Sequence, residues 1–457
     1  MISTLSLRGR ILSVVLALLF FSTLFQLWPS RYFQNGHEVG LDSGAQVDSA
    51  VPQHDSQRTG DVPGSQNSGG HGHDGSDNLL NETRYISSWG ASAGWTNDVI
   101  TFSNLVYLGI LTDRVPILPE FLSTHIRGII TIPFSEVFDL PRFRKLLGRP
   151  VLEWREVKDA ESETIDELGC WNVWATMNFK QQETHDPAPR ETWISDLLNL
   201  DISYTKTPPW ISLKPYIPTE PWSSFWSLAA LSFPDKRKAS LVPPEPSPIK
   251  HVSLPPDEHL LCYDFVYYAV ALEGLEFQFD FSPAWRFVGR YMRWTPRLEK
   301  LAEEYTRIAL GGVDLIPPYI SIHARRDDFK AYCSGGKISQ GLCLPTLDGY
   351  AAQVEEVQAE LAERGIHVRH VIITSDEDDP EWWKLVSARG WHYIDHVGLK
   401  TRERLGVWYP ILIDSVVLSA GIGHVGTEGS TMSWIAAKRV RDWHGGVTRL
   451  LDWSNSE

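Results

Sequence analysis

The last third of the chain alternates between short apolar runs and longer helix-like segments, and this alternation limits the possible folds more than any other feature. Runs rich in apolar residues predict strands at 319–322, 370–374, 391–394 and 421–425. The segments between and after them predict helices at 347–364, 382–389, 408–420 and 432–443. Strands separated by helices in this way indicate an α/β fold with a parallel sheet.

The first of these predicted strands ends in a cluster of charged side chains. The cluster consists of His323, Arg325, Arg326, Asp327 and Asp328. In open α/β sheets, ligands bind just beyond the carboxyl ends of the strands, and a pair of guanidinium groups there suits a phosphate. The alternative is a solvated turn with local ion pairs, which is common on protein surfaces.

Two loops rich in small residues are further candidates for binding an anion. Segment 426–431 joins a predicted strand to a predicted helix, and segment 88–95 leads through Thr96, Asn97 and Asp98 into another helix. Small residues at such junctions expose backbone N–H groups and a helix N-terminus to a ligand. Either loop could instead be an ordinary capped turn between two elements.

An acidic run, 376–379, follows the second predicted strand. Clustered carboxylates could hold a divalent cation. However, Asp379 stands directly before Pro380 and is better placed to cap the helix that begins there. Asp376, at the end of the strand, would then contact a ribose or a base. We therefore expect no metal site.

Four cysteines allow two disulfides in an oxidising compartment. Cys333 and Cys343 bracket a Gly-rich loop that follows the arginines. A disulfide between them would hold this loop in place and stabilise the fold by roughly 2–3 kcal/mol. Two free buried thiols are the alternative. The pattern leaves the pairing of Cys170 and Cys262 open.

The N-terminal part of the chain predicts a membrane anchor and a stem. Residues 11–28 are almost entirely apolar and follow two arginines, so residues 1–10 would stay in the cytosol. A cleaved signal peptide is the alternative, although no clear small-residue cleavage site follows the run. Residues 29–83 are polar and predict a flexible lumenal stem that carries a glycosylation acceptor at Asn81.

The middle of the chain carries weaker signals. We expect structure to start near Tyr85, with an extended segment at 115–119 and helical or mixed structure at 134–147. The Pro-rich segment 205–257 predicts a mostly irregular insertion on the surface. Segment 285–309 predicts one amphipathic helix.

Three segments resemble the motifs of the GDP-fucose protein O-fucosyltransferase-like family. Residues 323–329 (His-Ala-Arg-Arg-Asp-Asp-Phe) are similar to its H-x-R-R-x-D-F/W signature. Residues 426–433 are similar to its C-terminal G-(S/T)-x-x-S-T-F-S motif, and residues 94–98 to its N-terminal G-x-x-N-Q loop. The two-cysteine loop and residues 374–377 look most like the fungal branch.

This resemblance implies a GT-B fold, in which two Rossmann-like domains enclose a cleft. Residues 84–300 would form the acceptor-side domain, and residues 301–443 the domain that binds the GDP-sugar, with 444–457 as a C-terminal tail. The family also implies inverting, metal-independent transfer from GDP-fucose as donor substrate, with no cofactor.

The resemblance further implies roles for single residues. Arg325 would hold the β-phosphate and stabilise the departing GDP. The expected substrate-binding residues are Asn97, His323, Arg326, Asp328, Phe329, Asp376, Thr427, Ser430 and Thr431. The chain departs from the family pattern at Asp98, where Gln is common, at Met432, where Phe is common, and in lacking a Glu before Asn97. We expect Asp98 to be the catalytic base, since a carboxylate could take the acceptor's proton, with helix capping as its alternative role.

Taken together, these features predict a type II membrane glycosyltransferase in the lumen of the Golgi or endoplasmic reticulum. It would move fucose from GDP-fucose to a hydroxyl of a protein or glycan. A net charge of −15 argues against nucleic acid as a partner. The alternatives are a transferase that uses another GDP-sugar, and a membrane-tethered binding protein of the same fold without catalysis.

Overall fold

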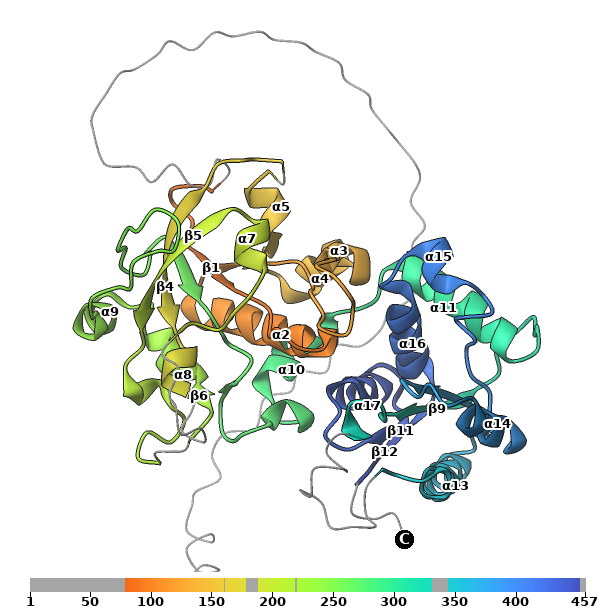
Figure 1. Ribbon diagram of the computed structural model, residues 1–457. Helices are drawn as coiled ribbons and strands as arrows, with labels where there is room; N and C mark the ends of the chain where they lie inside the picture. The colour runs from red at the N-terminus through yellow and green to blue at the C-terminus, as the bar shows by residue number, and fades with distance from the viewer. Residues whose placement is uncertain (1–78, 160, 178–187, 218–219, 331–343, 453–457) are drawn as a thin grey trace, which may run out of the picture. The chain divides into compact units, whose positions relative to one another are not determined.

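A six-stranded parallel sheet organises the first half of the structure, a computed structural model that describes residues 79–452 except 160, 178–187, 218–219 and 331–343 (Figure 1). Its strands follow the spatial order β3-β2-β1-β7-β4-β5. Their bounds are Tyr85–Ser88 (β1), Val115–Leu118 (β2), Leu152–Glu153 (β3), Asp166–Asn172 (β4), Leu200–Lys206 (β5) and Leu260–Tyr263 (β7). The sequence pattern indicated β2 as an extended segment but did not indicate β4, β5 or β7.

Helix α2 (Trp95–Thr112) connects β1 to β2 and is almost completely buried. Its apolar residues, among them Val99 and Phe102, recur at three- and four-residue spacing and join the main hydrophobic core. The helix ends at Asp113, which takes the left-handed conformation (φ 51°). The loop before α2 therefore lies at the carboxyl end of β1, where ligands bind in parallel sheets.

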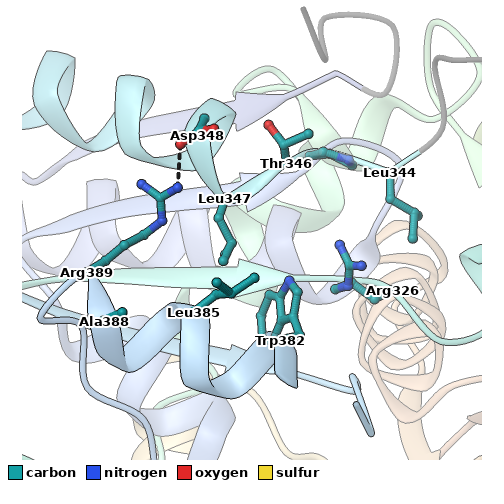
Figure 2. Close-up of a pocket in the computed structure, with 10 residues that line it drawn as sticks. Arg326, Leu344, Thr346, Leu347, Asp348, Trp382, Leu385, Ala388 and Arg389 are labelled. Atoms are coloured by element: carbon teal, nitrogen blue, oxygen red, sulfur yellow. Dashed lines mark hydrogen bonds and ion pairs between the residues drawn. The ribbon is translucent and has the colours of Figure 1, made fainter. Parts of the chain in front are cut away.

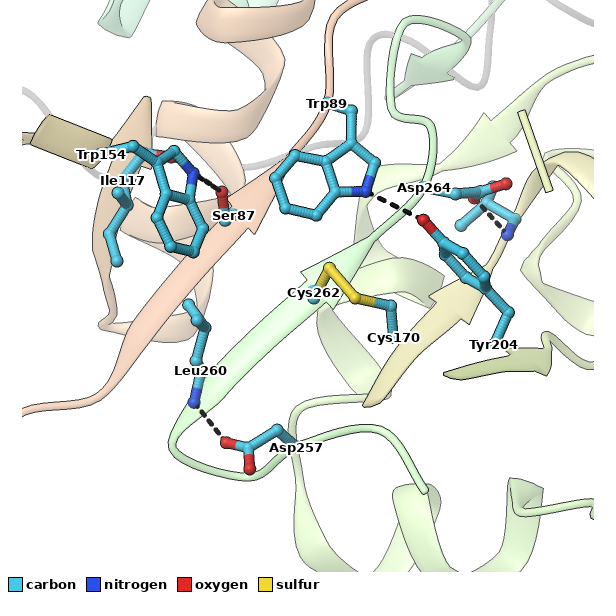
Figure 3. Close-up of a disulfide and its surroundings, with 11 residues drawn as sticks. Ser87, Trp89, Ile117, Trp154, Cys170, Tyr204, Asp257, Leu260, Cys262 and Asp264 are labelled. Carbon is cyan, nitrogen blue, oxygen red and sulfur yellow. Dashed lines mark hydrogen bonds between the residues drawn. A yellow bond between two sulfur atoms is a disulfide. The ribbon is translucent and has the colours of Figure 1, made fainter. Parts of the chain in front are cut away.

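A disulfide between Cys170 and Cys262 joins neighbouring strands β4 and β7 (Figure 3). It is fully buried in a second core on this sheet, together with Trp89 and Trp154. The two indoles are satisfied by hydrogen bonds to the Tyr204 hydroxyl (3.1 Å) and the Ser87 hydroxyl (3.0 Å). The expected Cys333–Cys343 disulfide lies outside the described residues.

A four-stranded parallel sheet organises the second half, in the order β10-β9-β11-β12. Its bounds are Tyr319–Ala324 (β9), His370–Ser375 (β10), Gly423–Thr427 (β11) and Val447–Leu451 (β12). Three of the predicted strands are thereby confirmed. The prediction of a strand at 391–394 is wrong, because only His392 makes a bridge, to Ile372, before the chain turns away. The prediction of a tail at 444–457 is also wrong, since β12 pairs with β11 along its whole length.

Helices cover this smaller sheet as expected from the sequence. They are α13 (Leu347–Glu363), α14 (Pro380–Ala388), α16 (Tyr409–Ala420) and α17 (Thr431–His444). Side chains of β9 alternate between two faces, as the pleat requires. Ile320 and Ile322 join the core beneath α13, whereas the Tyr319 hydroxyl donates to the Val417 carbonyl on α16 (2.8 Å). The same alternation turns His323 toward α17.

The predicted helix at 285–309 is two helices. The first is α10 (Pro283–Phe287), and the second is α11 (Pro296–Ala309), which starts afresh because Thr295 caps it and Pro296 occupies its first turn. The Pro-rich segment is also more ordered than expected. It contains α8 (Phe225–Ala230) and α9 (Pro234–Ser240), and Phe225 is fully buried in the main core.

The remaining elements are short. They are α3 (Phe134–Val137), α4 (Leu140–Leu147), α5 (Trp154–Val157), α6 (Trp174–Met177), α7 (Ile194–Leu197), α15 (Thr401–Leu405), β6 (Ser223–Ser224) and β8 (Ala269–Val270). Helices α3 and α4 confirm the expectation of helical structure at 134–147. The predicted anchor at 11–28 and nearly all of the stem lie outside the described residues. Within the described residues, no helix has the length and apolar character needed to cross a lipid bilayer.

Candidate functional site

A cavity of about 700 Å³ brings together the carboxyl ends of strands from both sheets. Its wall from the six-stranded half consists of residues 92–97, 123–126 and Tyr267. Its wall from the four-stranded half consists of His323, Arg325, Asp327, Asp328, Phe329, Asp376, Arg402, Val407, Pro410, Ile411 and residues 429–432. Eight of the expected site residues therefore line one cavity: Asn97, His323, Arg325, Asp328, Phe329, Asp376, Ser430 and Thr431.

Arg325 is held at this cavity by acceptors on several sides. One guanidinium nitrogen lies 2.6 Å from Asp376 Oδ2, and the other lies 2.7 Å from Asp328 Oδ2. The second nitrogen also lies 3.4 Å from His125 Nε2. The Phe329 ring lies 5.6 Å from the guanidinium carbon. The guanidinium is thus fixed in orientation while it remains at the cavity wall.

Two helix N-termini open into the same cavity. Helix α2 begins there with Gly94 as its N-cap, and α17 begins there with Ser430. Among the described residues, no side chain caps either helix start. The Thr431 hydroxyl donates to Asn97 Oδ1 (2.9 Å) and lies 2.7 Å from the Thr96 hydroxyl, so it ties the two helix starts together. Uncapped N–H groups and the positive ends of two helices favour an anion here.

Hydrogen bonds hold His323, which lines the cavity, and Thr427 behind it. The His323 side chain is buried, and its Nδ1 lies 2.8 Å from the Ser433 hydroxyl. Burial, together with the nearby Arg325 charge, lowers the pKa of His323 to about 3. The Thr427 hydroxyl donates to the His323 carbonyl (3.0 Å) and accepts from the Arg325 N–H (2.9 Å). Thr427, an expected substrate-binding residue, is fully buried and does not line the cavity.

Asp98, the expected catalytic base, does not line the cavity. Its side chain is fully buried, and its two oxygens accept from the N–H groups of Ala91 (2.6 Å) and Leu122 (3.1 Å). Burial raises the pKa of Asp98 to about 7, against the effect of these two hydrogen bonds. The carboxyl group therefore holds two loops together behind the wall that Asn97 lines.

Arg326 also departs from expectation, because it lines a second cavity of about 500 Å³ (Figure 2). Its Nε donates to Glu377 Oε2 (2.5 Å), and its guanidinium lies 5.1 Å from the Trp382 ring. The Glu377 side chain is buried and also pairs with Lys330 (2.6 Å). Burial raises the pKa of Glu377, but the hydrogen bonds from Arg326 and Lys330 outweigh this effect and bring it to about 2. Arg326 is therefore engaged in an internal ion pair.

Two carboxylates of the acidic run at 376–379 accept hydrogen bonds from other groups of the protein. Asp379 caps α14 by accepting from the Glu381 N–H (2.9 Å), as expected. Asp376 accepts from the Arg326 N–H (2.7 Å) in addition to its ion pair with Arg325. The described residues contain no group of three or more His, Cys, Asp or Glu side chains arranged to hold a metal ion.

Three cavity residues with ionisable side chains were missed in the sequence. His125 follows β2 by only a few residues, so the rule that ligands bind beyond the ends of strands could have indicated it. Tyr267 and Arg402 lie in segments with no local pattern that indicates a site. Their position in the cavity depends on long-range packing alone.

No protein-family model matches the chain, and no curated protein matches it. Among solved structures, POFUT1 in complex with GDP-fucose is similar, with a TM-score of 0.51, 15% sequence identity, and coverage of 82% of this chain and 99% of that one. POFUT1 in complex with GDP gives 0.51 and 16% identity, and its apo form gives 0.50 and 16%, with the same coverage. The chain therefore shares the α/β fold of POFUT1.

Proposed function

We propose that this protein is a glycosyltransferase that moves fucose from GDP-fucose to a hydroxyl group of a protein or glycan. The shared fold supports this proposal, because POFUT1 has been solved with both GDP-fucose and GDP. Parts of all three motifs that resemble the O-fucosyltransferase-like family lie at the cavity: residues 94–97, His323, Arg325, residues 327–329 and residues 429–432. Fold and motifs thus support the same donor.

The observation that carries the proposal is the position of Arg325 beside two uncapped helix starts in one cavity. A diphosphate needs several donors that converge from different directions. Arg325 would supply charge-assisted hydrogen bonds, and the N-termini of α17 and α2 would supply backbone N–H groups. A volume of about 700 Å³ is in the range of pockets that hold a small-molecule ligand.

The proposed reaction is an inverting transfer without a metal ion. The Arg325 guanidinium would stabilise the negative charge that develops on the departing GDP, and Asp328 and Asp376 would keep it in orientation. Phe329 would contribute an apolar surface next to the nucleotide. His323 would act through position rather than charge, since its lowered pKa keeps the imidazole neutral.

We also propose that the catalytic part lies in the lumen of the Golgi or endoplasmic reticulum, anchored by residues 11–28. The disulfide between Cys170 and Cys262 supports an oxidising compartment. Asn81 is exposed, as a glycosylation acceptor must be. Peptide-N-glycosidase treatment of the protein made in its own cells should therefore change its mobility on a gel.

The test is calorimetric titration of the full chain with GDP, UDP and GDP-fucose in the presence of a chelator. The proposal predicts that GDP and GDP-fucose bind and that UDP binds far more weakly. Binding of GDP without turnover of any GDP-sugar would favour the non-catalytic binding protein. Turnover of a different GDP-sugar would favour the alternative donor, and absence of any guanine-nucleotide binding would contradict the whole proposal.

A further inference from the structure

The cavity must contain a group that accepts the proton of the attacking hydroxyl, and Asp98 is too deeply buried to do so. The carboxylates of Asp328 and Asp376 are both engaged with Arg325. Asp327 lines the cavity too, but it lies on the same loop as Arg325, in the wall formed by the four-stranded half. In an inverting reaction the base acts on the face of the sugar opposite to the leaving group. The base should therefore come from the wall formed by the six-stranded half.

His125 is the side chain with a basic nitrogen on that wall. Its loop is fixed to the start of α2, because the Thr124 N–H donates to the Ala93 carbonyl (3.0 Å). The backbone N–H of His125 also donates to the Ser123 hydroxyl (3.3 Å). A Cβ at Gly94 would lie 3.2 Å from the imidazole Cδ2 and 3.3 Å from Nε2, so glycine leaves the ring room beside the helix start.

The His125 imidazole faces the Arg325 guanidinium through Nε2. A guanidinium can only donate hydrogen bonds, so the His125 Nε2 that faces it at 3.4 Å must be the acceptor. Of the contacts that Arg325 makes to His125, Asp328 and Asp376, this one is the longest. A diphosphate bound by Arg325 would compete with these acceptors and would release the imidazole most easily. The Nε2 lone pair would then be available inside the cavity.

We propose that His125 is the general base of the transfer, an inference that rests on the proposed function. In the step, a lone pair of the acceptor oxygen forms a bond to the anomeric carbon of the sugar. The bond from that carbon to the β-phosphate oxygen breaks, and its electron pair leaves with GDP beside Arg325. The hydroxyl proton passes to His125 Nε2, and the imidazolium later returns it to water. Arg325 thus holds both the donor phosphate and, before the donor binds, the base in its unprotonated form.

The experiment measures the release of GDP from GDP-fucose by the full chain, with water as the probe acceptor. His125→Gln should lower turnover by about 10²–10⁴-fold, the usual contribution of general base catalysis, while GDP affinity changes by less than about threefold. The turnover rate of the wild-type chain should fall as the pH is lowered. The turnover rate of His125→Gln should not show this fall. The other charged or titratable groups that share the cavity are Arg325, Arg402, Asp327, Asp328, Asp376, His323 and Tyr267.

Restoration of turnover by azide distinguishes a catalytic base from a residue that only positions the substrate. Because azide has no proton to lose, it should restore GDP release to His125→Gln, whereas it should not restore Arg325→Ala. His367→Gln is the matched control, since His367 is exposed in the loop before β10 and does not line the cavity. Unchanged turnover in His125→Gln, or loss confined to Asp327→Asn, would overturn this inference and leave the proposed function standing. Failure of the wild-type chain to bind GDP would overturn both.

Discussion

The two cavities at the end of β9 differ in the surroundings of the arginine that lines each of them. The larger one holds Arg325, hydroxyl groups, two imidazoles and two helix N-termini. The smaller one holds Arg326, and its other walls are mostly apolar side chains such as Leu347, Trp382 and Leu385 (Figure 2). Arg326 is bound there to the buried carboxylate of Glu377. Two adjacent residues of one motif therefore have different surroundings, since Arg325 lines the larger cavity and Arg326 is held in an ion pair.

Arg325→Ala should have the largest effect on activity. Removing the cation beside the departing phosphate should lower GDP release from GDP-fucose by about 10²–10³-fold, the usual cost of losing one preorganised donor. The melting temperature should change little, because the side chain lies at a cavity wall. Arg364→Ala is the matched control, since Arg364 pairs with Glu360 on the surface and lines neither cavity. Equal turnover in Arg325→Ala and Arg364→Ala would contradict the comparison.

Arg326→Ala should show the opposite pattern. Its loss leaves the Glu377 carboxylate buried with only Lys330 as a cationic partner, which should lower the free energy of unfolding by about 3 kcal/mol. Urea unfolding measures this change. The double variant Arg326→Met and Glu377→Gln should recover part of the stability, because no buried charge is then left unpaired. If the single variant lost activity but kept full stability, Arg326 would belong to the ligand site after all.

Asp98→Asn should lower the free energy of unfolding by about 2 kcal/mol, because the amide can accept only one of the two N–H groups that the carboxyl accepts. The variant should keep its turnover. The pKa of Asp98 is raised from 3.8 to about 7, so the folded protein binds a proton that the unfolded chain has lost in this range. The free energy of unfolding of the wild-type chain should therefore fall as the pH rises from about 4 to 7, by at most about 1.4 kcal/mol per pH unit. Asp98→Asn should lack this slope in urea unfolding measured across pH, and an unchanged slope would contradict the assignment.

Leu385→Ser should have the smallest effect of the four. Leu385 is 59% exposed at the smaller cavity, so its replacement should change stability by less than about 0.5 kcal/mol. GDP affinity should also stay the same, because we propose the larger cavity as the donor site. Calorimetry on this variant checks the point directly. A clear loss of GDP binding would move the nucleotide to the cavity beside Arg326.

Most of the four-stranded half, although not β12, could be predicted from its sequence because its signals are local. Strands such as β9 and β10 are continuous apolar runs, and Asp379 with Pro380 marks the start of α14. The six-stranded half could not, since β4 and β5 mix polar and apolar residues and are stabilised by pairing with distant segments. Local pattern also could not separate Arg325 from Arg326.

The same limit applies to the site. The motifs located Arg325, Asn97 and Thr431 correctly at one cavity, because each follows a strand or starts a helix. The burial of Asp98 could not be predicted, because the sequence does not show that Ala91 and Leu122 fold back onto its side chain. Such contacts join residues that are separated in the chain, and only the folded structure shows them.

A crystal structure of the protein with GDP would test the central claim most directly. We predict that the diphosphate oxygens lie within hydrogen-bond distance of the Arg325 guanidinium and of the first backbone N–H groups of α17. Arg326 should keep its ion pair with Glu377 in that complex. Nucleotide bound instead beside Arg326 and Trp382, or a diphosphate out of reach of Arg325, would contradict the account.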